Sequence, residues 1–190
     1  MTTEATEHRF DRDTAVTPIG GGVYTTVPSA EWNAPAGPNG GYVAALLARA
    51  VLAEVADHER ALRSFTAQFV RPPRTGEELR IIVTVDRAGR TVTNLSVRAE
   101  QADGKLVAMG IAIAGTDQVG ALDYAGTSPA MPDPADVPTL PVLAQMPPIS
   151  ARYLMKPCLG PPPFSGGDEA LSGGWIRLTE PRPFDALAAV

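Results

Sequence analysis

The hydrophobic pattern along the chain is organised around one apolar stretch, residues 38–53. Two glycines open it, and apolar residues then fill nearly every position, with Arg49 inside the run and Glu54 just after it. Ala and Leu favour helix, no proline interrupts the run, and apolar residues on most faces are typical of a buried helix. At about 16 residues, or about 24 Å, it is too short for a membrane span. We therefore predict a central helix that begins at the N-cap Asn39 and is covered by neighbouring segments.

Alternating apolar and polar residues predict the strands that cover this helix. One strand precedes it at residues 23–27, after a turn at Gly20-Gly21-Gly22. Four more strands are predicted after the helix, and Asp103-Gly104 is a tight-hairpin signal between the last two of them. These later strands are predicted at residues 64–71, 79–87, 91–101 and 106–114. We expect one antiparallel sheet that curls around the helix, an α+β arrangement.

The rest of the chain gives weaker patterns. Residues 1–17 are polar and are predicted as a solvated arm, while the prolines between residues 128 and 148 predict a connector without helix or strand. Two short strands are predicted at residues 149–155 and 174–179, with a loop at 157–167 between them. The start of a second apolar helix is predicted at residues 184–190.

Composition and charge exclude several classes of function. A net charge of −5 argues against nucleic acid or an anionic membrane as a partner. With one cysteine, Cys158, and two histidines, His8 and His58, we expect no internal disulfide and no cysteine- or histidine-based metal site. The N-terminus lacks the basic start and apolar core of a signal peptide, so the expected location is cytoplasmic.

Several segments, taken in order, carry a resemblance to a known family. The segments are Pro38-Asn39-Gly40-Gly41-Tyr42, residues 64–73 with the ending Phe69-Val70-Arg71-Pro72, Arg87-Ala88-Gly89-Arg90, Trp175-Ile176-Arg177-Leu178 and Arg182-Pro183-Phe184-Asp185. In them the chain resembles acyl-CoA thioesterases of the double hot-dog type, within the thioesterase-like superfamily related to bacterial acyl-CoA thioesterase II. The resemblance implies two hot-dog units, each a curled antiparallel sheet around a helix.

The resemblance also implies that only the first hot-dog unit is complete. The expected division is an N-terminal arm, a first unit, a proline-rich connector and a partial second unit, at residues 1–17, 18–115, 116–148 and 149–190. The family's catalytic aspartate, threonine and glutamine have no counterpart in this sequence, and Asp185 comes too early in the second helix to be that aspartate. We therefore expect a further segment or partner chain, a truncated chain, or a non-catalytic relative. Exposed apolar surface and an unpaired sheet edge would also favour a homo-oligomer.

Asn39, Gly40 and Gly41 are the candidate catalytic residues. Free amides and a partial positive charge at a helix start suit the oxyanion that develops when a thioester carbonyl is attacked. The alternative is that the two glycines only allow the helix start to pack tightly against the sheet. Ser64 and Gln68 lie on the adjacent strand, and alternation alone leaves the side that they face open.

Arg71 and Arg90 are the candidate contacts for CoA phosphates, because a guanidinium group matches phosphate oxygens. The alternative is that both side chains are simply solvated. The two histidines are not placed for a Ser-His-Asp arrangement, and Cys158 has no basic neighbour in sequence that would activate its thiol.

The resemblance implies an acyl-CoA thioesterase-like protein of fatty acid metabolism. It would hydrolyse acyl-CoA to free fatty acid and CoA without a cofactor or metal, and would need a further segment or chain for full activity. The alternative is a non-catalytic acyl-CoA-binding or assembly subunit with the same fold. A hot-dog hydratase is a third interpretation, which would require an Asp and a His that face one another.

Overall fold

The computed structural model describes residues 8–101, 103–120, 124–161 and 165–190, and it divides into two units. The first unit holds the described residues up to Gln118 together with 183–190, and the second holds those between 119 and 182. The first seven residues of the predicted arm and residues 162–164 of the predicted loop lie outside the described residues.

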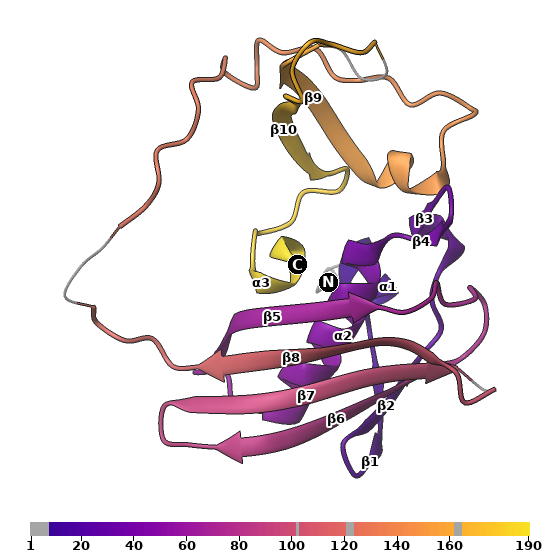
Figure 1. Ribbon diagram of the computed structural model, residues 1–190, viewed down its shortest axis with the longest axis vertical. Coiled ribbons are helices and arrows are strands. Elements are labelled where there is room, and N and C mark those ends of the chain that lie inside the picture. The colour runs from indigo at the N-terminus through magenta and orange to yellow at the C-terminus, as the bar shows by residue number, and fades with distance from the viewer. Residues whose placement is uncertain (1–7, 102, 121–123, 162–164) are drawn as a thin grey trace, which may run out of the picture. The chain divides into compact units, whose positions relative to one another are not determined.

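A six-stranded antiparallel sheet forms the body of the first unit (Figure 1). Its strands lie in the order β1-β2-β6-β7-β8-β5, which places β5 at one edge. The predicted strands are confirmed with small shifts at their ends, and β1 joins them at the other edge. The bounds are β1 Thr17–Gly20, β2 Val23–Thr26, β5 Ala61–Phe69, β6 Leu79–Ala88, β7 Val92–Gln101 and β8 Leu106–Gly115.

The predicted buried helix is confirmed as α2, Gly40–Val55, which packs against β5, β6, β7 and β8. It begins at its N-cap Asn39 and ends at Ala56, whose φ of 50° lies in the left-handed region. Fully burying one Leu or Val side chain stabilises a fold by about 1.5–3 kcal/mol. The residues that form this core on the sheet alternate along β6, β7 and β8 and are Leu79, Ile81, Val83, Leu95, Val97, Ala99, Ala108, Ala112 and Ala114.

The two polar residues that interrupt the apolar pattern of α2 both have partners. Arg49 Nη2 lies 2.8 Å from Asp11 Oδ1 and 2.8 Å from Thr14 Oγ1. Glu54 accepts a hydrogen bond of 2.8 Å from the hydroxyl of Tyr24 on β2. These pairs therefore join the helix to the N-terminal segment at one point and to the sheet at another.

The solvated arm predicted for residues 1–17 is wrong for its described part. Arg9–Asp13 form the short helix α1, in which Phe10 is buried. The rings of Phe10 and Trp32 form a T-shaped pair, with their centroids 5.7 Å apart. Trp32 ends the 3₁₀ helix η1, Ala30–Trp32, and the two-residue strands β3, Asn33–Ala34, and β4, Gly37–Pro38, then lead to α2. The sequence missed α1 because one buried aromatic in five residues gives no periodicity.

The second unit contains a two-stranded antiparallel hairpin. Its strands are β9, Tyr153–Leu159, and β10, Gly173–Leu178, preceded by the 3₁₀ helix η2, Pro148–Arg152. Trp175 Nε1 donates a hydrogen bond of 3.0 Å to the carbonyl of Pro132, so the proline-rich connector is tied to this hairpin.

Two sequence predictions are wrong in this unit. Helix η2 occupies the first part of the strand predicted at 149–155, because the prolines at its start fix φ and offer no amide to a strand. Strand β9 continues into the loop predicted at 157–167. Pro157 is tolerated in β9 because this strand pairs on one side only in the described sheet.

The apolar C-terminal segment forms the helix α3, Ala186–Ala189, in the first unit. Asp185 caps it by accepting a hydrogen bond of 3.0 Å from the amide of Ala188. Leu187 is buried, whereas Phe184, predicted within this helix, precedes it and is exposed. Of the helices that the structure describes, none combines the length and apolar character needed to cross a membrane.

Candidate active site

The start of α2 is shaped by the side chain of Asn39. Its Oδ1 accepts hydrogen bonds from the amides of Gly41, at 2.9 Å, and Tyr42, at 3.3 Å, while its own amide donates to the carbonyl of Trp32. The predicted N-cap is therefore confirmed. Within the described residues the amide of Gly40 has no such acceptor, and Gly40 is half-buried. One N–H group of the first turn thus remains available to a ligand.

The two glycines allow close approach of other groups to this helix start. A Cβ on Gly40 would lie 3.3 Å from the ring of Phe69, and one on Gly41 would lie 3.1 Å from Asn39 Oδ1 and 3.2 Å from the carbonyl oxygen of Val190. Larger residues would therefore crowd the strand β5 and the end of the described chain. These short contacts are consistent with the tight-packing interpretation, and the amide of Gly40, without an acceptor among the described residues, is consistent with the oxyanion interpretation.

An open pocket of about 580 Å³ lies at the start of α2. Apolar side chains of β5, including Leu62, Phe65 and Phe69, form much of its wall, and α3 forms another part. Arg63 is the charged residue of the lining, and it contacts Asp117 and the carbonyl of Gly115. No Asp, Glu or His is among the described residues that line this pocket. The pocket therefore offers an amide donor and an apolar surface, without a lining base.

Ser64 and Gln68 lie in different places. Ser64 lines the pocket at the start of α2, whereas Gln68 lines a second pocket with Thr66, Met109 and Ile111. Side chains alternate between the two faces of a strand, and Phe65, Ala67 and Phe69 of β5 line the pocket beside α2. Thr66 and Gln68 therefore point to the opposite face, where the second pocket lies. Of the two, only Ser64 is close to the candidate active site.

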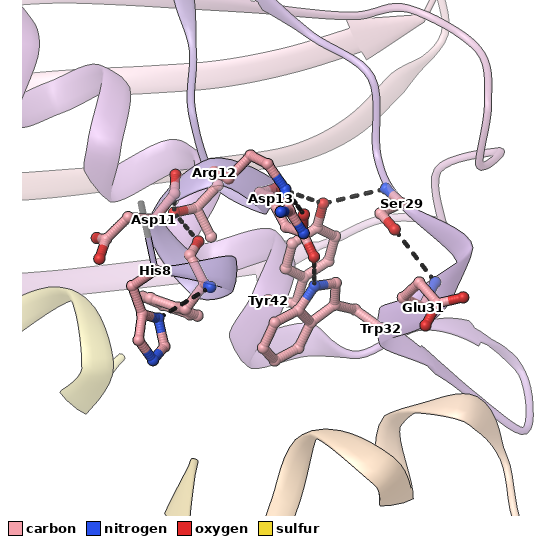
Figure 2. A network of polar contacts seen from close by, with 10 residues as sticks. His8, Asp11, Arg12, Asp13, Ser29, Glu31, Trp32 and Tyr42 are labelled. Atoms are coloured by element: carbon pink, nitrogen blue, oxygen red, sulfur yellow. Dashed lines mark hydrogen bonds and ion pairs between the residues drawn. The ribbon is translucent and has the colours of Figure 1, made fainter. Parts of the chain in front are cut away.

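A polar network that sequence patterns did not reveal holds the first turn of α2 (Figure 2). The hydroxyl of Tyr42 donates to the carbonyl of Asp13 at 2.7 Å and accepts from the amide of Ser29 at 3.1 Å. Burial raises the pKa of Tyr42 to about 12. Trp32 Nε1 donates to Asp13 Oδ2 at 3.0 Å, and its ring stacks on Tyr42 with centroids 5.3 Å apart. The network therefore connects α1 and η1 to the helix start.

The N-terminal side of this network is completed by His8. Its Nδ1 accepts a hydrogen bond of 3.1 Å from the amide of Phe10 and so caps α1 (Figure 2). His58 is exposed just beyond the other end of α2, and Cys158 is half-buried in the second unit. Neither of them lines the pocket at the start of α2.

Arg71 and Arg90 are not brought together by the fold. Arg71 follows the end of β5, close to the start of α2, whereas Arg90 lies in the turn between β6 and β7. The carbonyl of Arg90 accepts a hydrogen bond of 3.0 Å from Arg60, which precedes the first residue of β5. The two arginines therefore lie at opposite ends of β5, a strand of roughly 30 Å at about 3.3 Å per residue.

Comparison with known proteins shows which family this part of the chain resembles. Residues 28–115 match the model of the acyl-CoA thioesterase N-terminal domain. This range covers α2 and the strands β5, β6, β7 and β8, and it leaves out β1 and β2 of the same sheet. Among curated protein sequences, none matches the chain significantly.

Solved structures share the fold over most of the chain. A conserved protein of unknown function with a hot-dog fold from Alicyclobacillus acidocaldarius is 26% identical, with a TM-score of 0.82 over 96% of this chain and 67% of that one. An acyl-CoA thioesterase II, TesB2, from Mycobacterium marinum is 20% identical, with a TM-score of 0.70 over 94% of this chain and 64% of that one. A tesB protein from Mycobacterium avium subs paratuberculosis is 16% identical, with a TM-score of 0.65 and the same two coverages.

The chain thus spans less than two thirds of the length of these two mycobacterial proteins. The predicted hot-dog fold, an antiparallel sheet packed on a central helix, is confirmed by these similarities. Residues 28–115, which hold the central helix and the strands β5 to β8, are therefore similar to the acyl-CoA thioesterase N-terminal domain.

Proposed function

We propose that the chain hydrolyses acyl-CoA thioesters to free fatty acid and CoA. The observation that carries this proposal is that the family match, residues 28–115, includes the helix start that opens into the 580 Å³ pocket. An available amide and an apolar wall are what a thioester carbonyl and its acyl chain require. The proposal adds no cofactor and no metal to these groups.

The proposed chemistry is centred on the first turn of α2. The substrate carbonyl oxygen would accept a hydrogen bond from the amide of Gly40, with its acyl chain against Leu62, Phe65 and Phe69. When water attacks the carbonyl carbon, negative charge develops on that oxygen, and the positive end of the helix stabilises it. The carbon–sulfur bond then breaks, the water oxygen stays on the acyl carbon as part of the new carboxyl group, and the CoA sulfur leaves with the proton that the water gave up. In this scheme Asn39 orients the first turn of α2, and Gly41, which has no side chain, leaves room for the substrate to approach that turn.

Activation of the attacking water is assigned to a group outside the described pocket lining. The described lining residues include no Asp, Glu or His, so their side chains offer no ordinary general base. We therefore propose that a further segment or a partner chain completes the site. Strand β5 is suited to receive it, because it is at an edge of the sheet and carries an exposed Phe69. Pairing with a second copy of the chain would give a homo-oligomer.

The wider assignments belong to the same proposal. They are a role in fatty acid metabolism, a cytoplasmic location and a division by sequence into an N-terminal segment, a first hot-dog unit, a connector and a partial second unit at residues 1–17, 18–115, 116–148 and 149–190. For the CoA phosphates we propose Arg71 rather than Arg90, since Arg71 is at the end of β5 where α2 begins.

The second candidate is a non-catalytic acyl-CoA-binding or assembly subunit. The observation that favours it is the same absence of an acid or histidine among the described lining residues. Calorimetric titration with CoA and with acyl-CoA distinguishes the two functions. Binding of both ligands without any hydrolysis supports the subunit.

The direct test is a hydrolysis assay with medium- and long-chain acyl-CoAs. The chain is measured alone and together with the segment or chain that completes its second unit. We expect release of free CoA, faster in the completed form. Absence of turnover in both forms would contradict the thioesterase proposal.

A further inference from the structure

A second, smaller cleft lies at the end of the sheet where β5 ends. It has a volume of about 190 Å³ and lies between the segment that follows β5 and the turn between β7 and β8. Three cationic side chains line it: Arg71, Arg74 and Lys105. Asp103 also lines the cleft, so its lining holds three cations and one carboxylate, and this positive balance favours an anionic ligand.

The carboxylates near this cleft leave one positive charge uncompensated. Asp103 contacts Arg74 at 3.1 Å and Lys105 at 2.9 Å, and its hydrogen bond with Lys105 is the main reason that its pKa lies below the usual value. Glu77 contacts Arg74 at 3.3 Å. No carboxylate of the described chain lies within 4.0 Å of the Arg71 guanidinium, and Arg71 is exposed. Arg71 is therefore the cation available to a ligand.

The backbone that carries these cations is held in place on both sides. The side chain of Gln101, only 6% exposed, accepts a hydrogen bond from the amide of Arg74 and donates one to its carbonyl, both at 2.9 Å. The amides of Val70 and Arg71 donate to the carbonyl of Val107, at 2.9 and 3.1 Å. A fixed loop loses little conformational freedom when it binds a ligand.

The cleft adjoins the candidate active site through one short segment of the chain. Phe69 lines the pocket at the start of α2, and Arg71 lines the cleft two residues later. On the other side, a Cβ on Gly37 would lie 3.0 Å from Cβ of Pro72, and Gly37 is two residues before Asn39. One elongated ligand can therefore reach both sites.

We propose that the cleft formed by Arg71, Arg74 and Lys105 binds phosphate groups of the CoA moiety while the thioester carbonyl lies at the start of α2. This inference rests on the proposed function. Phosphate oxygens accept charge-assisted hydrogen bonds from guanidinium and ammonium groups, which are about twice as strong as neutral ones. Arg71 supplies the free guanidinium, and Arg74 and Lys105 add donors that Asp103 holds in place.

The inference is tested by calorimetric titration of the full chain with CoA. Arg71→Gln and Lys105→Gln are compared with Arg87→Gln, an exposed arginine near the far end of β6. We expect Arg71→Gln to raise the Kd for CoA about 10-fold and Lys105→Gln to raise it by a smaller factor, with melting temperatures unchanged. Arg87→Gln keeps the wild-type Kd. Equal Kd values for Arg71→Gln and Arg87→Gln, or no CoA binding by the wild-type chain, would overturn the inference.

Two further experiments are needed. The first distinguishes CoA phosphate from free phosphate as the ligand, and the second distinguishes failure of the cleft proposal from failure of the thioesterase proposal. Inorganic phosphate that binds in the cleft while CoA does not would assign a free anion site and overturn the inference. In the hydrolysis assay, Arg71→Gln should raise KM for an acyl-CoA and leave the rate with a phosphate-free acyl-pantetheine unchanged. If acyl-CoA is hydrolysed and Arg71→Gln leaves KM unchanged, the cleft does not bind the CoA phosphates, and the thioesterase proposal stands. If Arg71→Gln loses CoA binding and no form of the chain hydrolyses acyl-CoA, the cleft binds CoA and the thioesterase proposal fails.

Discussion

The hydroxyl of Tyr42, in the first turn of α2, donates a hydrogen bond of 2.7 Å to the backbone carbonyl of Asp13 in α1. Tyr42 is only 1% exposed, and the same hydroxyl accepts from the amide of Ser29. The position of the helix start therefore depends on a buried contact with a segment that precedes the sheet (Figure 2).

We expect Tyr42→Phe to lower the free energy of unfolding by about 1–3 kcal/mol. The substitution leaves the carbonyl of Asp13 and the amide of Ser29 without their partner, and a buried polar group that loses its hydrogen bond costs about this much. Denaturant unfolding measures the change. Tyr124→Phe is the matched control, because Tyr124 is 90% exposed. Equal stability of the two variants would show that the contact contributes nothing.

Stability should also fall in alkaline solution through the buried tyrosines. Burial raises the pKa of Tyr42 in the folded protein to about 12, above the ordinary value of 10.0. The unfolded chain therefore loses this proton first, so the stabilising contribution is complete below pH 10 and is lost as the pH rises toward 12. Tyr24 behaves in the same way. Unfolding midpoints between pH 9 and 12 should fall less steeply in Tyr42→Phe than in the wild-type chain.

Gly40→Ala should impair the hydrolysis of long-chain acyl-CoA while it changes the free energy of unfolding only slightly. The added Cβ would lie 3.3 Å from the ring of Phe69, which is 54% exposed and can move outward, so we expect a change in stability below about 1 kcal/mol. The displaced ring would narrow the pocket and raise KM for long acyl chains. Gly126→Ala, where the new Cβ meets nothing within 4 Å, is the control. Wild-type KM values in both variants would place the acyl chain elsewhere.

The two arginines predicted from sequence should differ in their effect on KM. Arg71→Gln should raise KM for acyl-CoA several-fold, because it removes a phosphate contact. Arg90→Gln should not, since Arg90 is a strand length away from the start of α2. The comparison is made by steady-state hydrolysis of one acyl-CoA. A larger effect of Arg90→Gln would mean that the phosphates bind at the other end of the sheet.

Sequence patterns identified the elements that are long enough to show a period. Helix α2 and the strands β5 to β8 each carry about ten or more residues of consistent apolar spacing, so their positions and their packing could be predicted. Helix α1 was not predicted, because Phe10 is its only buried apolar residue. Helix η2 was predicted as a strand, because apolar and polar residues alternate by chance in Ile149-Ser150-Ala151-Arg152.

The candidate site was predictable in part. Asn39 before two glycines is a local signal, and the N-cap follows from local chemistry alone. The separation of Arg71 from Arg90 depends on the direction of β5 and on strand pairing, which no short motif encodes. The network around Tyr42 joins residues far apart in sequence for the same reason. Arg74 and Lys105 were missed because they meet only when the β7–β8 turn closes beside the end of β5.

The oxyanion position is tested most directly by the hydrolysis of acyl-CoA by Asn39→Asp, compared with the wild-type chain and with Asn94→Asp on β7. Aspartate caps a helix as well as asparagine, so the melting temperature should not change. It also adds a negative charge beside the amide of Gly40, where the oxyanion would form, so we predict that kcat falls at least about 10-fold. Asn94→Asp should retain the wild-type kcat. A wild-type kcat in Asn39→Asp would contradict the assignment of the oxyanion to the start of α2.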